Sequence, residues 1–149
     1  MYHMTSKTIS IPTPSGGAIQ IGGDGEFVLI AGPCAIETYD HCMIMADLIG
    51  KVCGKYNVRW IFKACYDKDC RSSPSSFHGV GLEKGLKILE RVRQETGLPV
   101  TSDFSDPSWG SATGEVVDLI QVPAYLCRQT SILRAAAETG KPIHLKKGQ

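Results

Sequence analysis

The sequence lacks the long hydrophobic runs and the one-sided charge that mark several classes of protein. No apolar run reaches the ~18 residues that a membrane-spanning helix needs. The opening MYHMTSKTIS has neither the charged start nor the apolar core of a signal peptide. The 16 Lys and Arg residues against 15 Asp and Glu residues give a formal net charge of +1, so no overall field holds the protein to nucleic acid or to a membrane surface. We therefore expect a cytoplasmic protein that binds small molecules, with any anion site confined to one locality.

Paired cysteine motifs are also missing. The chain has 6 cysteines, at positions 34, 42, 53, 65, 70 and 127, and none of them forms a CxxC pair. A chain of 149 residues, 42% of them hydrophobic, can bury an ordinary core without a disulfide framework. This composition excludes disordered and collagen-like proteins. We expect reduced thiols in a globular α/β protein.

Strand and helix patterns alternate along the chain. Continuous apolar runs that end in polar residues predict buried strands, and apolar residues at helical spacing, such as Ile44, Leu48, Ile49 and Val52, predict helices. The expected strands cover residues 26–32, 58–64, 99–103, 117–123 and 142–147. The expected helices are 38–53, capped by Thr38 and ended by Gly54, 82–96, closed by Gly97, a weak 107–116, and 130–139, capped by Thr130 and Gly140. This order is typical of a parallel sheet with right-handed crossovers.

Two architectures fit that order, an open doubly wound sheet or part of a (β/α)8 barrel. The length alone favours the open sheet, because a complete barrel typically needs ~250 residues. However, no GxGxxG and no GxxxxGK[ST] follows a strand, and the sequence stops directly after one, at KKGQ. We expect the first half of a (β/α)8 TIM barrel, about five strands over residues 27–149. Residues 1–26, with TISI and AIQI on either side of TPSGG, predict a β-hairpin that precedes it.

Polar and charged residues gather at the predicted carboxyl ends of the strands, where parallel α/β proteins place their function. Cys34 follows the first strand, Asp103 ends the third and Gln121 lies in the fourth. Fixed ammonium and guanidinium groups replace the lost hydration of phosphate and carboxylate groups, so the pattern predicts a site for one or two anionic substrates. The cations at these ends are Lys63, Lys68, Arg71, Arg128, Lys146 and Lys147. Lys63 is the most informative, because a lysine directly after the apolar WIF is expensive to bury without an anion.

Several long motifs carry a resemblance. The segments IAGPCAIE (30–37), WIFKACYDKDCRSS (60–73), GLEKGLKIL (81–89), IQVPAYLCRQT (120–130) and AAAETGKPIHLKKGQ (135–149) are similar to the 3-deoxy-8-phosphooctulonate synthase family. The family is built on a (β/α)8 barrel and condenses phosphoenolpyruvate with arabinose 5-phosphate, releasing phosphate, on the route to the lipopolysaccharide sugar Kdo. The resemblance implies the same fold and substrates here.

The resemblance also implies roles for individual residues. Lys63 and Lys68 match lysines that hold phosphoenolpyruvate, and with Asp103 they are the expected catalytic residues. The further substrate-binding residues that match are Arg71 and Ser72 for the pentose phosphate, Lys146 for the phosphate of phosphoenolpyruvate, and Gln121, which with Asp103 lines the pocket. Arg128 matches an arginine that crosses to a neighbouring subunit, which implies a homo-oligomer, a tetramer in the family. Cys34 matches a thiolate ligand of a divalent metal, Zn, Fe or Mn, whose other ligands belong to the barrel half that this chain lacks.

The sequence departs from the family in one loop. The family's KANRSS is KDCRSS here, so Asp69 and Cys70 replace an alanine and an asparagine. With Pro74, this loop resembles that of the sister enzyme, 3-deoxy-arabino-heptulosonate 7-phosphate synthase, which uses erythrose 4-phosphate. Because half of the barrel is missing, we expect this chain to be an enzyme fragment that is inactive alone. Three alternatives stay open: an octulosonate synthase, a heptulosonate synthase and a non-catalytic half-barrel that binds a partner.

Overall fold

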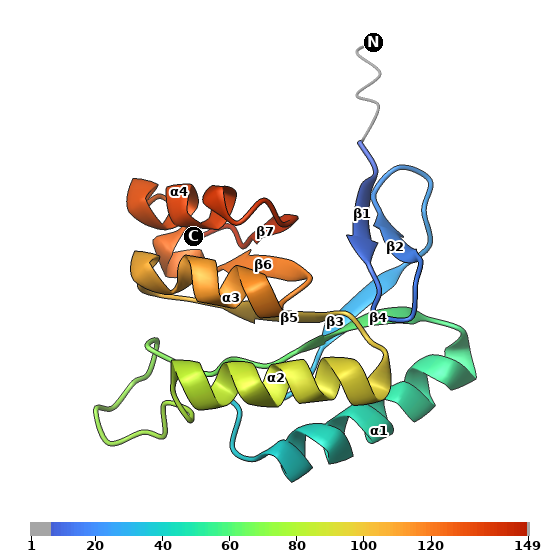
Figure 1. The fold of residues 1–149 in the computed structure, drawn as a ribbon, viewed down its shortest axis with the longest axis horizontal. Helices are drawn as coiled ribbons and strands as arrows, with labels where there is room; N and C mark the ends of the chain where they lie inside the picture. Colours follow the sequence, from blue (N-terminus) through green and yellow to red (C-terminus); the bar gives the residue numbers. More distant parts are fainter. Residues whose placement is uncertain (1–6, 149) are drawn as a thin grey trace.

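The computed structural model describes residues 7–148 as a parallel sheet with helices on one side and a separate hairpin (Figure 1). The hairpin strands are β1 (Ile9–Pro12) and β2 (Ala18–Ile21), which pair antiparallel. The sheet consists of β3 (Val28–Ala31), β4 (Arg59–Lys63), β5 (Val100–Asp103), β6 (Leu119–Val122) and β7 (Ile143–Leu145). The helices are α1 (Tyr39–Tyr56), α2 (Leu82–Thr96), α3 (Gly110–Val116) and α4 (Thr130–Glu138). Two short 3-10 helices, η1 (Pro107–Trp109) and η2 (Ala124–Leu126), complete the chain.

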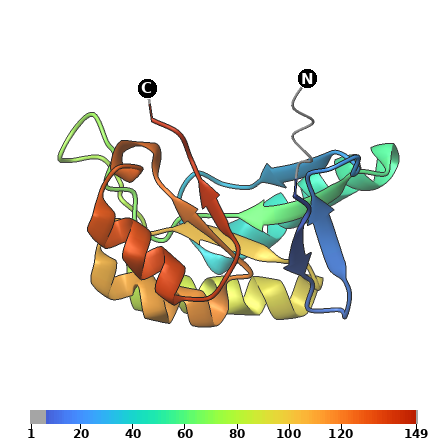
Figure 2. The same ribbon diagram turned by 90° about the horizontal axis from the view of Figure 1, so that it is seen from above.

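The five-stranded sheet is the first half of a barrel. All four of its pairings are parallel, and the spatial order β3-β4-β5-β6-β7 is also the sequence order. A doubly wound sheet reverses its strand order at a switch point, and this sheet does not, so the open-sheet alternative is wrong. Seen from above, the sheet curls, with α2, α3 and α4 along its outer side (Figure 2). The predicted half-barrel and its N-terminal hairpin are confirmed.

Successive side chains of each strand point to opposite faces of the sheet. In β4, Trp60 and Phe62 belong to the core beneath the helices, whereas Ile61 belongs to a second cluster on the concave face. Lys63 follows Ile61 at a spacing of two and therefore faces the concave side. The apolar run that looks uniform in sequence is thus divided between a helix-covered core and a barrel interior.

The hairpin covers the amino end of that interior. Ile11 of β1 and Ile19 of β2 are buried against Ile61 and Leu119 of the sheet. The concave face is consequently apolar near the amino ends of the strands and polar toward the carboxyl ends. This arrangement leaves the carboxyl end of the interior for the predicted site.

Helix α1 differs from the expectation at its end and on its faces. The Thr38 side chain caps it as predicted, accepting a hydrogen bond from the His41 amide. However, the helix passes Gly54 and ends at Tyr56, and the left-handed backbone of the cap residue Asn57 (φ 52°) lets its amide reach the carbonyls of the last turn. Small side chains let α1 approach the sheet closely, so its buried residues are Cys42, Ala46 and Cys53. Most of the apolar residues that predicted the helix face outward instead, namely Ile44, Leu48 and Val52.

The other helices largely follow the prediction. Gly97 ends α2 in the left-handed conformation, and the weak helix at 107–116 exists as η1 followed by α3. Thr130 does not cap α4, because Gln129 occupies the N-cap position and makes no side-chain hydrogen bond. Within the part of the chain that is described, no helix is both long and apolar enough to cross a membrane.

Candidate anion-binding site

A row of polar side chains crosses the concave face at the carboxyl ends of the strands. Asp103 is paired in register with Gln121, and Gln121 with His144, so side chains of β5, β6 and β7 share one level of the barrel. Cys65 reaches the same end of the interior from beyond β4, where it forms an isolated parallel bridge with Ala35. Parallel strands thus bring together residues that lie up to 79 positions apart, from 65 to 144.

Asp103 is the centre of this row. Its side chain is 9% exposed, and Lys63 Nζ and Lys68 Nζ lie 4.0 Å and 3.8 Å from its two carboxylate oxygens. These distances exceed a hydrogen bond. The Gln121 amide donates to Asp103 Oδ2 at 3.4 Å, and Oδ1 is buried without a hydrogen-bond partner among the described residues. The Asp103 carboxylate is therefore stabilised mainly by the charges of the two lysines and less by hydrogen bonds.

Lys68 keeps its positive charge. Burial works to lower the pKa of Lys68, but attraction to the Asp103 carboxylate and neighbouring thiols outweighs it, and the pKa is raised above its usual range. Two lysines face one aspartate, so the formal charges of this part of the site sum to an excess of positive charge. Lys63 has therefore met the anion that its burial required, and an excess of positive charge remains for a ligand.

The backbone near Lys63 is tightly packed. Gly32 follows β3 with φ +156°, and a Cβ at this position would lie 2.0 Å from the carbonyl oxygen of Lys63. No side chain fits there. The glycine in GPC thus lets β3 approach β4 directly beside the lysine, which fixes the backbone that carries it.

A second group of cations lines an adjoining groove of about 600 Å³. Arg128, Lys146 and Lys147 contribute to it, together with Cys70 and Tyr125. Cys70 and Tyr125 also line the small space beside Asp103, so the groove adjoins the centre of the site. Burial and nearby acidic groups raise the pKa of Tyr125 to about 12, so its hydroxyl stays protonated at neutral pH.

The remaining predicted residues lie at the rim. Arg71 and Ser72 are exposed on the loop between β4 and α2, and Cys34 is exposed beyond β3. Nothing in this chain tests the roles that the resemblance gives them, which stay predictions. Residues 1–6, including His3, lie outside the described residues.

Two members of the site escaped the sequence analysis. Cys65, one of the six thiols, is buried, and its sulfur accepts a hydrogen bond from Lys63 at 2.9 Å. The alternation of side chains along a strand, which places residues 63 and 65 on one face, was the available signal. His144 of β7 is the second. Its Nδ1 is buried and unpartnered within residues 7–148, and burial, with Lys146 and Lys63, lowers its pKa.

The described residues do not provide a complete metal site. Between residues 7 and 148, no three His, Cys, Asp or Glu side chains are grouped so that they could hold a metal ion. A catalytic zinc site ordinarily takes three protein ligands. The exposed Cys34 alone therefore does not fit a catalytic metal.

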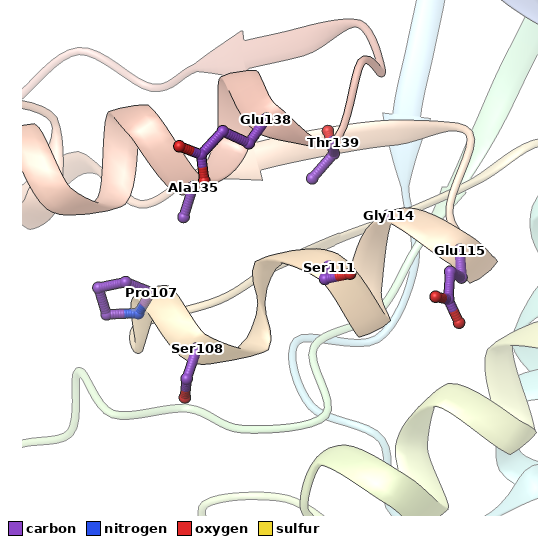
Figure 3. A pocket seen from close by; sticks show the side chains of 8 residues that line it. All are labelled: Pro107, Ser108, Ser111, Gly114, Glu115, Ala135, Glu138 and Thr139. Carbon is purple, nitrogen blue, oxygen red and sulfur yellow. The ribbon is translucent and has the colours of Figure 1, made fainter.

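A second hollow, of about 380 Å³, lies between α3 and α4 on the helical side (Figure 3). Its charged side chains are Glu115 and Glu138, with Ser108 and Ser111 nearby. It contains no strand-end residue and no cation, so it does not suit an anionic substrate. The candidate site remains the concave face.

Together these features define one half of a (β/α)8 barrel with a candidate anion-binding site at the carboxyl ends of its strands. The model of the DAHP synthetase I family matches residues 4–149. The chain belongs to this family.

Comparison with curated proteins shows which members of the family the chain is similar to. The chain is 51% identical over 131 residues to the 2-dehydro-3-deoxyphosphooctonate aldolase of Koribacter versatilis (strain Ellin345), 88% of this chain and 47% of that protein. It is 48% identical to the protein of that name from Rickettsia rickettsii (strain Sheila Smith), over 88% of this chain and 48% of the relative. The protein of that name from Desulfotalea psychrophila (strain LSv54 / DSM 12343) is 43% identical over 95% of this chain and 50% of its own length. The chain thus spans about half the length of the curated relatives it matches.

Proposed function

We propose that this chain supplies the phosphoenolpyruvate-binding half of a 2-dehydro-3-deoxyphosphooctonate aldolase. The whole enzyme condenses phosphoenolpyruvate with arabinose 5-phosphate and water to form the eight-carbon sugar acid phosphate and inorganic phosphate. The observation that carries the proposal is the convergence of Lys63 and Lys68 on Asp103 at the carboxyl ends of the strands, in a chain 43–51% identical to relatives of that name.

The chemistry of the residues supports an anionic enol phosphate as the ligand. Phosphoenolpyruvate carries a carboxylate and a phosphate, and the site offers two separate groups of cations. Lys63 and Lys68 lie deep in the interior, whereas Lys146, Lys147 and Arg128 line the adjoining groove. Their fixed charges replace the hydration of the ligand and orient it. Asp103 holds the two deep lysines close together before the ligand arrives.

The whole enzyme of this proposal also contains the other half of the barrel. The sheet has β3 and β7 as its outer strands, and the exposed face of α1 carries Ile44, Leu48 and Val52. We propose that further strands and helices of the whole enzyme cover these edges. The assembly is a cytoplasmic homo-oligomer in which Arg128 reaches a neighbouring subunit. We propose Cys34 as one ligand of a divalent metal whose remaining ligands lie outside this chain.

The family match is also compatible with a second activity, that of a 3-deoxy-arabino-heptulosonate 7-phosphate synthase. Its description names the DAHP synthetases, and Asp69 and Cys70 stand where the octulosonate synthases have alanine and asparagine. A thiol in place of an amide loses both a good donor and a good acceptor. Assays of the whole enzyme with arabinose 5-phosphate and erythrose 4-phosphate distinguish the two: the acceptor that triggers phosphate release identifies the activity.

A binding experiment tests the part assigned to this chain. We expect the chain to bind phosphoenolpyruvate in calorimetric titrations, and Lys68→Met to weaken binding about 10-fold or more, because a charge-assisted hydrogen bond is lost. Lys51→Met is the matched control: this lysine is exposed and pairs with Asp47 one turn away, so its loss leaves the affinity unchanged. Equal affinity of the wild type and Lys68→Met contradicts the proposal. Absence of binding in the wild type favours a non-catalytic half-barrel.

A further inference from the structure

Cys65 lies against the most deeply placed lysine of the site. It follows Lys63 by two residues in an extended stretch, so both side chains leave the backbone on the concave side. Lys63 Nζ donates a hydrogen bond to Cys65 Sγ at 2.9 Å. The Cys65 residue is completely buried, and the Lys63 side chain is 20% exposed. The contact is therefore internal to the site and shielded from solvent.

The thiol is the acceptor that orients the ammonium group. The nearest Asp103 oxygen lies 4.0 Å from Lys63 Nζ, which is beyond hydrogen-bond distance. Asp103 therefore attracts Lys63 by charge alone, without fixing the direction of its N–H bonds. Within residues 7–148, Cys65 is the hydrogen-bond acceptor that the Lys63 ammonium meets.

The protonation state of Cys65 matters for this contact. Burial raises the pKa of the thiol, and the nearby Asp103 carboxylate raises it further against the opposing influence of Lys63. The thiol is consequently neutral at physiological pH. A neutral acceptor directs the ammonium group without cancelling its charge, whereas a second carboxylate would compete with the ligand.

We propose that Cys65 is a positioning residue whose thiol holds the Lys63 ammonium toward the ligand while leaving its full charge available. The identity of the ligand, phosphoenolpyruvate, rests on the proposed function. The positioning itself rests on the contact between Lys63 and Cys65 and on the burial of both side chains.

Three substitutions separate hydrogen bonding from packing. Cys65→Ser keeps an acceptor at this position. Cys65→Ala is smaller than cysteine, whereas Cys65→Val is larger by about one methyl group and suits an extended backbone. The two variants therefore bracket the volume of the thiol, and neither has an acceptor. We expect Cys65→Ser to bind phosphoenolpyruvate within about 3-fold of the wild type, and Cys65→Val and Cys65→Ala to bind about 10-fold more weakly, the loss of one hydrogen bond to a charged group. If Cys65→Val binds like the wild type while Cys65→Ser binds like Cys65→Ala, the thiol only fills space and the proposal is wrong.

A second readout does not depend on the ligand. The rate at which an amine-reactive ester acylates Lys63 is measured by peptide mass spectrometry and normalised to the exposed Lys51. We expect faster acylation of Lys63 in Cys65→Val and Cys65→Ala than in the wild type and Cys65→Ser, because the amine is no longer held. Equal rates in all four proteins overturn the proposal. If the wild type does not bind phosphoenolpyruvate, the proposed function fails and the acylation rates alone decide. Thermal unfolding identifies any variant that does not fold, and the remaining acceptor-free variant then serves.

Discussion

Two buried aspartates lie at opposite ends of the same sheet and are held in different ways. Asp118 precedes β6 at the amino end of the strand and is 1% exposed. The Arg93 guanidinium donates hydrogen bonds to both of its oxygens, at 2.8 Å and 2.9 Å, and the Val100 amide donates to it at 3.0 Å. Asp103, at the carboxyl end of β5, has one hydrogen bond of 3.4 Å and two lysines at 3.8 Å and 4.0 Å.

The difference separates a carboxylate that stabilises the fold from one that maintains a site. The hydrogen bonds of Asp118 join the last turn of α2 to β5 and β6, so the charge is compensated within the folded chain. Asp103 leaves one oxygen without a hydrogen bond in the part of the chain that is described, and its lysines can turn toward another anion. This agrees with the general division of (β/α)8 barrels, in which the amino end serves stability and the carboxyl end serves function.

The largest expected effect breaks the comparison at Asp118. Asp118→Ala leaves Arg93 and the Val100 amide without their acceptor, and we expect the free energy of unfolding to fall by about 3 kcal/mol. This is the lower end for a buried pair, because the Arg93 side chain is 32% exposed and regains water. Urea unfolding followed by circular dichroism measures it.

Asp103→Ala is the matched variant for that experiment. Its two lysines are each about one-fifth exposed and regain water when the carboxylate is removed, so we expect a change of less than about 1 kcal/mol. Equal losses of stability in Asp103→Ala and Asp118→Ala would remove the distinction between the two ends of the sheet.

A smaller effect tests whether a helix cap near the carboxyl end of the sheet contributes to the free energy of unfolding. Thr38, before α1, accepts a hydrogen bond from the His41 amide at 3.0 Å. Thr38→Ala leaves this amide uncapped, and we expect a loss of about 1 kcal/mol in the same unfolding experiment. Thr38→Ser retains the oxygen and should unfold within a few tenths of a kcal/mol of the wild type. If serine and alanine are equally destabilising, the cap is not the cause.

The smallest effect concerns the dependence of stability on pH. The pKa of His144 is lowered from 6.5 by burial and by Lys146 and Lys63. The unfolded chain therefore takes up this proton at a higher pH than the folded chain, so stability falls as the pH falls below about 6.5. We expect a shallower fall for His144→Asn than for the wild type between pH 7.5 and 5.5. The other histidines are the same in both proteins, so the difference isolates His144, and parallel curves would show that its environment is unperturbed.

The sequence determined the architecture through local patterns. Apolar runs that end in polar residues gave the positions of all five parallel strands, and Gly97 marked the end of α2 because the left-handed backbone there favours glycine. The rules of βα connections left two architectures open, a doubly wound sheet and a barrel, and the missing phosphate-binding motifs and the family resemblance favoured the barrel. The same reasoning brought Lys63, Lys68 and Asp103 to one end of the sheet, where the structure has them within ionic contact.

Only the tertiary structure decided which faces are used and which side chains touch. Ile44, Leu48 and Val52 recur at helical spacing, yet α1 packs through Cys42 and Ala46, because the side that meets the sheet must be small enough for close approach. Likewise, the sequence predicted no site role for Cys65, because its contact with Lys63 depends on the distance between two side-chain ends in three dimensions. Helical and strand periodicity fix the direction in which a side chain leaves the backbone, whereas its partner is chosen by the elements packed against it.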